Sequence, residues 1–203
     1  DTREFADKDL NKDNQKKPIL GANDGASGVA ILMEIARFLN QNPLFNLGVD
    51  ILLTDGEDMG KPGDADSWAL GAKVFSNRLP HPIPFAAICV DMVGDSELTL
   101  PIERHSYMQA PQLVLDIWKL AQELGYAQFQ MELGRAIIDD HTAFYNKTGI
   151  PSIDIIDFDY PNKDINYWHT LEDTPDKCSA QSLEAVGTVL INYLYRLDLG
   201  MNE

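Results

Sequence analysis

Several acidic residues of this 203-residue sequence occur after short apolar runs or within a glycine-rich turn, and one histidine lies in the loop that follows another such run. They are Asp24, the neighbouring pair Glu57 and Asp58, Asp91 and His169. In open α/β sheets, ligands bind outside the carboxyl ends of the strands, so side chains that follow different strands converge on one edge. The sequence therefore predicts a cluster of carboxylates and an imidazole drawn from distant parts of the chain.

Such a cluster is suited to binding a metal ion. Converging carboxylates repel one another and raise each other's pKa, so a stable cluster requires a cation. Carboxylates with one imidazole suit Zn²⁺, which keeps three protein ligands and an open position in catalytic sites, whereas Ca²⁺ prefers more oxygen ligands. Glu57 and Asp58 point in different directions from one backbone. One can therefore bind metal while the other faces substrate as a general base.

Other functions fit the sequence less well. Residues 25–28 lack the Gly-x-Ser-x-Gly spacing of a nucleophile elbow, and no Gly-Lys-Ser/Thr ending marks a phosphate loop. A formal net charge of -16 and a pI near 4.4 disfavour nucleic acid as a partner, because a polyanion would be repelled. No apolar run reaches the roughly 18 residues of a membrane-spanning helix, so no transmembrane segment is predicted.

The elements that must position these residues follow from the apolar pattern. Apolar residues recur at helical spacing from Val29 and stop before Pro43, and dense apolar runs then alternate with further helical patterns. This alternation indicates an α/β protein, a three-layer αβα sandwich with a mostly parallel central sheet. No linker interrupts it, so we expect one domain over residues 1–203. The expected strands are 47–54, 85–92 and 150–156, and the further helices are 67–78, 111–124, 141–148 and 179–197.

Six segments follow one another across almost the whole chain in the order of a known family: Asp1-Thr2, GANDGASG (21–28), DGED (55–58), VDMVG (90–94), DDHTAF (139–144) and WHTLEDT (168–174). Together they resemble the zinc-dependent aminopeptidases of the bacterial leucyl type and their relatives, the glutaminyl-peptide cyclotransferases. The resemblance implies a zinc exopeptidase-like fold with Asp24, Asp58 and His169 as zinc ligands and Glu57 as general base. Position 58 is usually Glu in this family, so Asp58 shortens that ligand by one methylene.

The resemblance also implies something about the start of the chain. Peptidases of this family hold a second zinc with the Asp matched by Asp91 and with a His two residues before the Asp matched by Asp1. That His would lie upstream of residue 1. We therefore expect residues 1–203 to be a catalytic domain that lacks an N-terminal portion of the full-length fold.

Two activities remain open at this point, and both act on the free N-terminus of a peptide. Three features lean toward a cyclase, which forms N-terminal pyroglutamate with release of ammonia: Trp168 directly before His169, the doubled acid that includes Asp140, and the VDMVGD form of the segment around Asp91. In cyclases the residues matched by Glu57, Asp91 and Asp140 share a proton, and the tryptophan walls the glutamine pocket.

Two of these features also have a plain structural explanation. Trp168 could be an ordinary packed aromatic, and Asp140 could be the N-cap of the following helix. The alternative to the cyclase is a zinc aminopeptidase that hydrolyses the first peptide bond, and a metal-dead binding domain is a third reading. A cyclase would bind one Zn²⁺ and an aminopeptidase two. Members of the family are commonly exported, so a periplasmic or secreted setting is expected.

Overall fold

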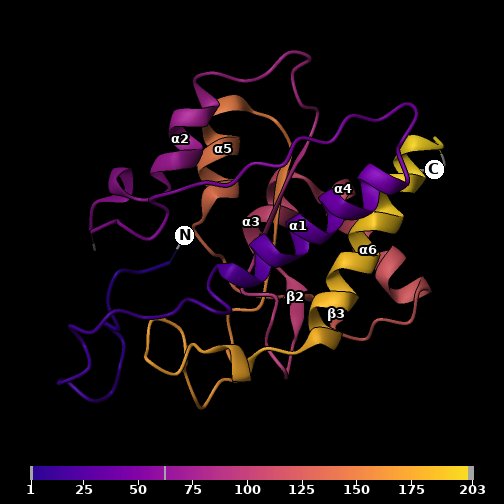
Figure 1. Ribbon diagram of the computed structural model, residues 1–203. Helices are drawn as coiled ribbons and strands as arrows, with labels where there is room; N and C mark the ends of the chain where they lie inside the picture. The colour runs from indigo at the N-terminus through magenta and orange to yellow at the C-terminus, as the bar shows by residue number, and fades with distance from the viewer. Residues whose placement is uncertain (1, 62, 201–203) are drawn as a thin grey trace.

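The computed structural model describes residues 2–61 and 63–200 and shows parallel strands with helices packed around them (Figure 1). The helices are α1 (Ala26–Gln41), α2 (Leu70–Ser76), α3 (Arg104–Gln109), α4 (Pro111–Glu123), α5 (Asp140–Thr148) and α6 (Ala180–Asp198). The strands are β1 (Ala87–Asp91), β2 (Leu100–Ile102), β3 (Phe129–Leu133) and β4 (Ser152–Ile156), and the 3₁₀ turns are η1 (Ala65–Ser67) and η2 (Pro175–Lys177). Helices cover the ladder of β1 and β4 from both sides, which confirms the α/β class.

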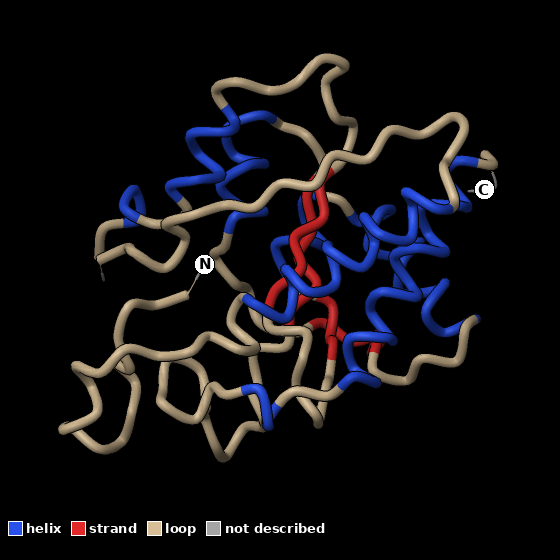
Figure 2. Tube along the Cα trace, viewed as in Figure 1, coloured by secondary structure: helices blue, strands red, loops and turns tan. Residues whose placement is uncertain are grey.

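The strands lie at the centre of the molecule, between groups of helices (Figure 2). Strand β1 pairs with β4 in parallel, with Ala87 opposite Ser152 and Asp91 opposite Ile156. Strand β2 pairs with β3, also in parallel, with a register shift between Pro101 and Ile102. Parallel pairing requires a long crossover between strands, which the helices supply. The carboxyl ends of β1 and β4 therefore lie at the same edge, as the sequence predicted.

The two faces of β4 have opposite characters because successive side chains of a strand point to opposite sides. Ile153 and Ile155 are fully buried and join the main hydrophobic core. Between them, Asp154 points its side chain to the other face, while its backbone N–H donates to Ser106 Oγ of α3 at 2.8 Å. One face of the strand thus anchors the core, and the other carries an acid into the polar side of the molecule.

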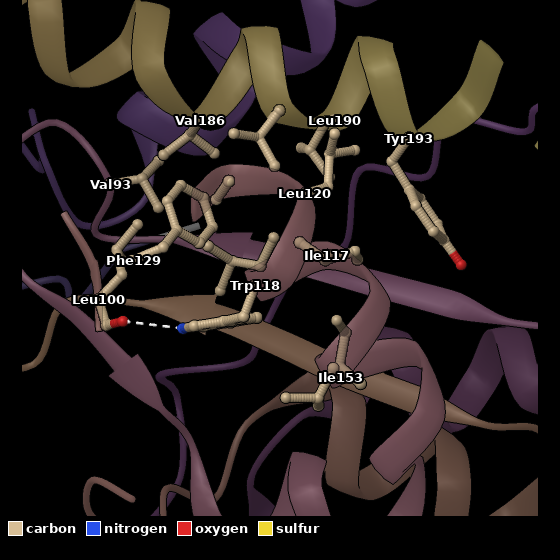
Figure 3. Close-up of a cluster of buried hydrophobic side chains, with 14 of the residues drawn as sticks. Val93, Leu100, Ile117, Trp118, Leu120, Phe129, Ile153, Val186, Leu190 and Tyr193 are labelled. Carbon is tan, nitrogen blue, oxygen red and sulfur yellow. Dashed lines mark hydrogen bonds between the residues drawn. The ribbon is translucent and has the colours of Figure 1, made fainter. Parts of the chain in front are cut away.

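The main core is built by α1, α4 and α6 against the strands. Helix α6 runs beside α1, although the two are distant in sequence (Figure 1). Trp118 of α4 lies at the centre of the core, and its Nε1 donates to the carbonyl oxygen of Leu100 at 3.0 Å (Figure 3). Phe129 packs edge-on against the same indole, with the ring centroids 5.3 Å apart. The core therefore fixes β2, β3 and β4 relative to the helices that the apolar pattern predicted.

The strand predicted at 47–54 is wrong for this structure. The segment is extended but belongs to no ladder among the described residues, and Val49, Ile51, Leu52 and Leu53 are exposed. Residues 52–54 line one wall of a pocket, and residues 88–90 of β1 line another. Because this pocket separates the segment from β1, their backbones do not pair. A dense apolar run was read as a buried strand, although burial depends on a neighbour that the sequence does not specify.

The remaining differences are additions and shortened boundaries. The structure forms β2, β3 and α3, none of which the apolar pattern indicated, because β2 spans only three residues and β3 has exposed side chains over most of its length. The helix expected at 67–78 is shorter, since Asn77 caps α2, and η1 precedes it. Within the described residues, no helix is both long and apolar enough to cross a membrane.

Candidate active site

Asp24, Asp58 and His169 meet at one buried point, although the first and the last are 145 positions apart in the chain. Their ligand atoms all lie within 4.8 Å of one another. His169 Nε2 is 3.0 Å from Asp58 Oδ2 and 3.2 Å from Asp24 Oδ2. All three side chains are buried. Two carboxylates therefore face the same imidazole nitrogen, which is the arrangement that the sequence predicted.

Asp24 is held in place through its backbone. The loop that carries it precedes α1, and the Asp173 carboxylate accepts hydrogen bonds from Asn23 N at 2.8 Å and Asp24 N at 3.3 Å. Tyr160 donates its hydroxyl to the same carboxylate at 3.0 Å. Gly28 then lets α1 approach β1, since a Cβ there would lie 1.9 Å from the carbonyl oxygen of Val90. The loop is thus fixed between Asp173 and the strand.

Glu57 and Asp58 lie on a loop that the start of α2 holds in place. Backbone N–H groups of Ala69, Leu70 and Gly71 donate to the carbonyl oxygens of residues 57, 56 and 55 in turn. Arg3 reaches across from the N-terminal loop and donates to the carbonyl oxygen of Asp58. These backbone bonds fix the direction in which the two neighbouring side chains leave the loop.

His169 is oriented from both sides of its ring. Asp7 Oδ1 lies 3.4 Å from Nδ1, the nitrogen that faces away from Asp24 and Asp58. A carboxylate that accepts a hydrogen bond there fixes the tautomer of a metal-binding histidine, and Asp7 lies at ion-pair distance from that nitrogen. The indole of Trp168 stacks on the imidazole, with ring centroids 3.9 Å apart and planes at 27°. His169 also has φ of +56°, in the left-handed region where a non-glycine residue is strained.

Glu57, Asp91 and Asp140 line the same pocket, beside Asp24. Asp91 is the last residue of β1, so it lies at the predicted edge of the sheet. Asp140 accepts a hydrogen bond from Thr54 Oγ1 at 2.5 Å, which ties α5 to the segment before Glu57. The N-cap of α5 is Asp139 rather than Asp140. The capping explanation for Asp140 is therefore wrong, and its carboxylate lies in the pocket.

The acids of the pocket keep their protons more tightly than ordinary carboxyl groups. Burial, followed by the charges of Asp139 and Asp58, raises the pKa of Glu57. Burial and the charge of Asp24 raise the pKa of Asp91 well above its usual range. Burial and the charge of Asp139 raise the pKa of Asp140 to about 6. The pocket can therefore hold protons near neutral pH.

The three-residue cluster fits a divalent cation. Asp24 Oδ2 is buried and faces only the shared Nε2 of His169, at 3.2 Å, so a buried carboxylate oxygen is left under-satisfied, which is costly. Burial lowers the pKa of His169, but hydrogen bonding to Asp24 and Asp58 outweighs it and raises the pKa to about 9. The cluster therefore takes up a positive charge, as a proton or as a metal ion. Two oxygens and one imidazole nitrogen suit Zn²⁺.

The structure brings together the residues that the sequence singled out, while their roles as ligands and catalysts stay predictions. Trp168 packs on His169 and on Phe158, so its structural contact is established and its contact with substrate is a prediction. Asp1 lies outside the described residues. Sequence reasoning missed Asp7 and Asp173, which support the cluster. Asp173 belongs to the WHTLEDT segment and carried a possible signal, whereas Asp7 lies in a loop without any pattern.

The comparisons with known proteins agree with this geometry. The model of peptidase family M28 matches residues 1–194. Glutaminyl cyclase from Porphyromonas gingivalis is 38% identical, with a TM-score of 0.91 over 97% of this chain and 70% of that one. A Zn-dependent exopeptidase from Parabacteroides distasonis is 35% identical, with a TM-score of 0.88 over 96% and 70% of the two chains.

A leucine aminopeptidase precursor from Bacteroides thetaiotaomicron is 37% identical, with a TM-score of 0.88 over 96% of this chain and 69% of that one. The comparison with curated proteins returned no match. The family and the exopeptidase neighbour support zinc as the metal of the cluster. From the site geometry and the match over residues 1–194, we conclude that the chain belongs to peptidase family M28 and that it is a zinc-dependent enzyme.

Proposed function

We propose that the chain is a glutaminyl-peptide cyclotransferase, which converts an N-terminal glutamine into pyroglutamate. The observation that carries the proposal is the group of three pocket acids, Glu57, Asp91 and Asp140. Among the described residues, none of the three belongs to the cluster of Asp24, Asp58 and His169. A site with one metal ion and separate carboxyl groups that can transfer protons fits a cyclase. The likeness to the P. gingivalis glutaminyl cyclase supports the same activity.

The reaction needs one proton removed and one delivered. The α-amine of the substrate attacks the side-chain carbonyl carbon of its own glutamine, a C–N bond forms, and the bond to the amide nitrogen breaks to release ammonia. A zinc ion held by Asp24, Asp58 and His169 would polarise that carbonyl. We assign the proton transfers to Glu57, which accepts the proton of the attacking amine and returns it to the leaving nitrogen. Asp91 and Asp140 share protons with it.

Trp168 has a place in this proposal as the wall of the glutamine pocket. Its indole also stacks on His169, so a large change there would disturb the cluster. Trp168→Phe keeps an aromatic ring against the imidazole. We expect this variant to raise KM for the Gln-initiated substrate more than it lowers kcat, because the lost contact serves ground-state binding.

The second candidate is a zinc aminopeptidase. It is favoured by Glu57, which adjoins Asp58 in the chain and lies in the same pocket as Asp24. A general base beside the metal could activate water for hydrolysis of the first peptide bond. The similarity to the leucine aminopeptidase precursor also supports this candidate. In that case Asp91 would bind a second zinc.

The two candidates differ in product and in the number of metal ions. The test is ammonia release from a Gln-initiated dipeptide, run beside hydrolysis of a leucyl arylamide, with zinc measured on the same sample of full-length protein. The cyclase predicts ammonia without arylamine. A dipeptide whose α-amine is acetylated is the control, because its amine can no longer attack. Arylamide hydrolysis without ammonia release would replace the cyclase with the aminopeptidase.

A further inference from the structure

A second cluster, with two buried members and one half-buried member, lies on the polar face of the β1 and β4 ladder. It consists of Cys89 on β1, Asp154 on β4 and Asp139 at the start of α5. Cys89 and Asp154 are direct neighbours in the ladder. Cys89 Sγ lies 3.9 Å from Asp139 Oδ1, and one ligand atom from each residue lies within 4.8 Å of the other two.

Asp154 is the unusual member of this cluster. Its side chain is fully buried, with 0% exposure, and neither carboxylate oxygen has a hydrogen-bond partner. Burying a carboxylate without donors costs several kcal/mol, so the group must be neutralised. Four of its neighbours, Asp139, Asp91, Glu103 and Asp140, are acids, and the one imidazole beside it, that of His141, is shared with Glu103. The neutralising charge is therefore a proton, on the carboxyl group or on His141, or a bound cation.

The surroundings of the cluster are compatible with a bound cation. His141 Nδ1 lies 3.7 Å from Asp154 Oδ2, and Nε2 of the same ring is 3.1 Å from Glu103 Oε2. Metal-binding carboxylates commonly have a polar neighbour that orients them, and His141, itself held by Glu103, is that neighbour of Asp154. Cys89 and Asp139 also line the pocket that contains Asp24, so an ion has a path of entry.

We propose that Cys89, Asp139 and Asp154 form a second metal site, separate from the Asp24, Asp58 and His169 cluster. One thiolate with two carboxylates suits Zn²⁺ or a similar transition-metal ion rather than Mg²⁺ or Ca²⁺, which prefer oxygen ligands throughout. Ligation displaces the thiol proton, so binding strengthens as the pH rises. The site does not depend on the proposed cyclase activity.

Cobalt(II) tests this proposal directly, because Zn²⁺ is spectroscopically silent and Co²⁺ reports its ligands. The full chain, freed of metal and loaded with Co²⁺, should show a near-ultraviolet sulfur-to-cobalt charge-transfer band. The Asp24, Asp58 and His169 cluster contains no sulfur, so it cannot produce this band. Cys89→Ser should abolish the band, and Asp154→Asn should weaken cobalt binding. Cys178→Ser is the matched control and should leave the band intact.

Zinc counting separates this proposal from the proposed function. A second zinc that disappears in Cys89→Ser but remains in His169→Ala belongs to the new site. A second zinc that survives in Cys89→Ser belongs instead to a two-metal peptidase arrangement at Asp91. If excess Co²⁺ gives no sulfur band in the unmodified protein, the proposal is overturned and a proton neutralises Asp154. A band that depends on Cys178 would overturn it as well.

Discussion

Glu103 and Asp154 lie on opposite sides of the His141 ring, yet their carboxylates differ in the number of hydrogen bonds that they accept. Glu103 is the N-cap of α3 and accepts hydrogen bonds from backbone N–H groups, from the Ser106 hydroxyl and from His141. Asp154 sits in the middle of β4 with no donor to either oxygen. Both side chains are buried. Local backbone geometry explains the difference.

A helix start offers free N–H groups to a carboxylate, whereas the N–H groups of a central strand are directed along the sheet. Hydrogen bonds from the protein therefore replace the water that the Glu103 carboxylate loses on burial. Although burial opposes its ionisation, the hydrogen bonds from His141, Ile137 and Ser106 lower the pKa of Glu103 to about 2. Burial raises the pKa of Asp154 well above its usual range. Glu103, which is well supplied with donors, serves the fold, and we expect the acids that line the pocket to serve chemistry.

The strongest test of this division is Glu57→Gln, in the pocket. Turnover of the active substrate should fall about 10²- to 10⁴-fold, because a positioned acid or base contributes that much and Gln transfers no proton. Zinc content and the free energy of unfolding should stay near those of the unmodified protein, since Gln has nearly the same size and shape as Glu and Glu57 lies outside the cluster of Asp24, Asp58 and His169. Steady-state kinetics, zinc analysis and urea unfolding measure the three quantities.

Glu97→Gln, on the exposed surface, is the control for this variant and should leave turnover unchanged. Full turnover in Glu57→Gln would remove Glu57 from the proton transfer. A large loss of stability would instead show that Glu57 supports the fold, and the division between the two kinds of buried acid would fail at this position.

Glu103→Gln should lower the free energy of unfolding rather than the turnover. The pKa of Glu103 is about 2 in the folded protein against an ordinary value of 4.5, so its ionised form stabilises the fold above pH 4.5. This stabilisation, about 3 kcal/mol, is lost as the pH falls from 4.5 through 2. The variant should therefore be less stable at neutral pH, and its unfolding free energy should depend less on pH in that window.

Urea unfolding at a series of pH values measures this effect, with Glu132→Gln on the exposed side of β3 as the control. An unchanged pH dependence in Glu103→Gln would contradict the role given to its hydrogen bonds. It would also mean that the hydrogen bonds to Glu103 stabilise its ionised form no more than the surroundings of Asp154 stabilise that of Asp154.

The smallest expected effect concerns Asp173, a buried acid that supports the metal cluster without belonging to it. Asp173→Asn removes the charge that accepts hydrogen bonds from Asn23 N and Asp24 N. We expect zinc affinity to fall about 10- to 100-fold, as for other residues that orient metal ligands. Competition with a chromogenic chelator measures the affinity.

Tyr160→Phe sharpens this test, because it removes one hydrogen bond to Asp173 and leaves the carboxylate in place. Its zinc affinity should fall less than that of Asp173→Asn. Equal affinities in the unmodified protein and Asp173→Asn would show that the loop before α1 holds Asp24 without this carboxylate.

Much of this architecture could be predicted from the sequence. The helices of the core and strands β1 and β4 have strong apolar patterns, and the structure places them within a few residues of the expected bounds. Asp91 was found because it ends an apolar run, and local pattern and chain direction place such a residue at the edge of a parallel sheet. Asp24, Glu57, Asp58 and His169 lie in turns and loops, and the order of the matched motifs supported their assignment to one site.

The tertiary structure decided which segments pair as strands and which residues support the site. The segment 47–54 has a strand-like sequence, but pairing needs a neighbour, and the pocket beside β1 leaves it without one among the described residues. Asp7 and Asp173 gain their roles only because loops far apart in the chain meet around His169 and Asp24. Residue type and order determine which groups are available for chemistry. Which of them stay unsatisfied in the interior depends on donors brought from elsewhere in the fold, and no local pattern encodes that.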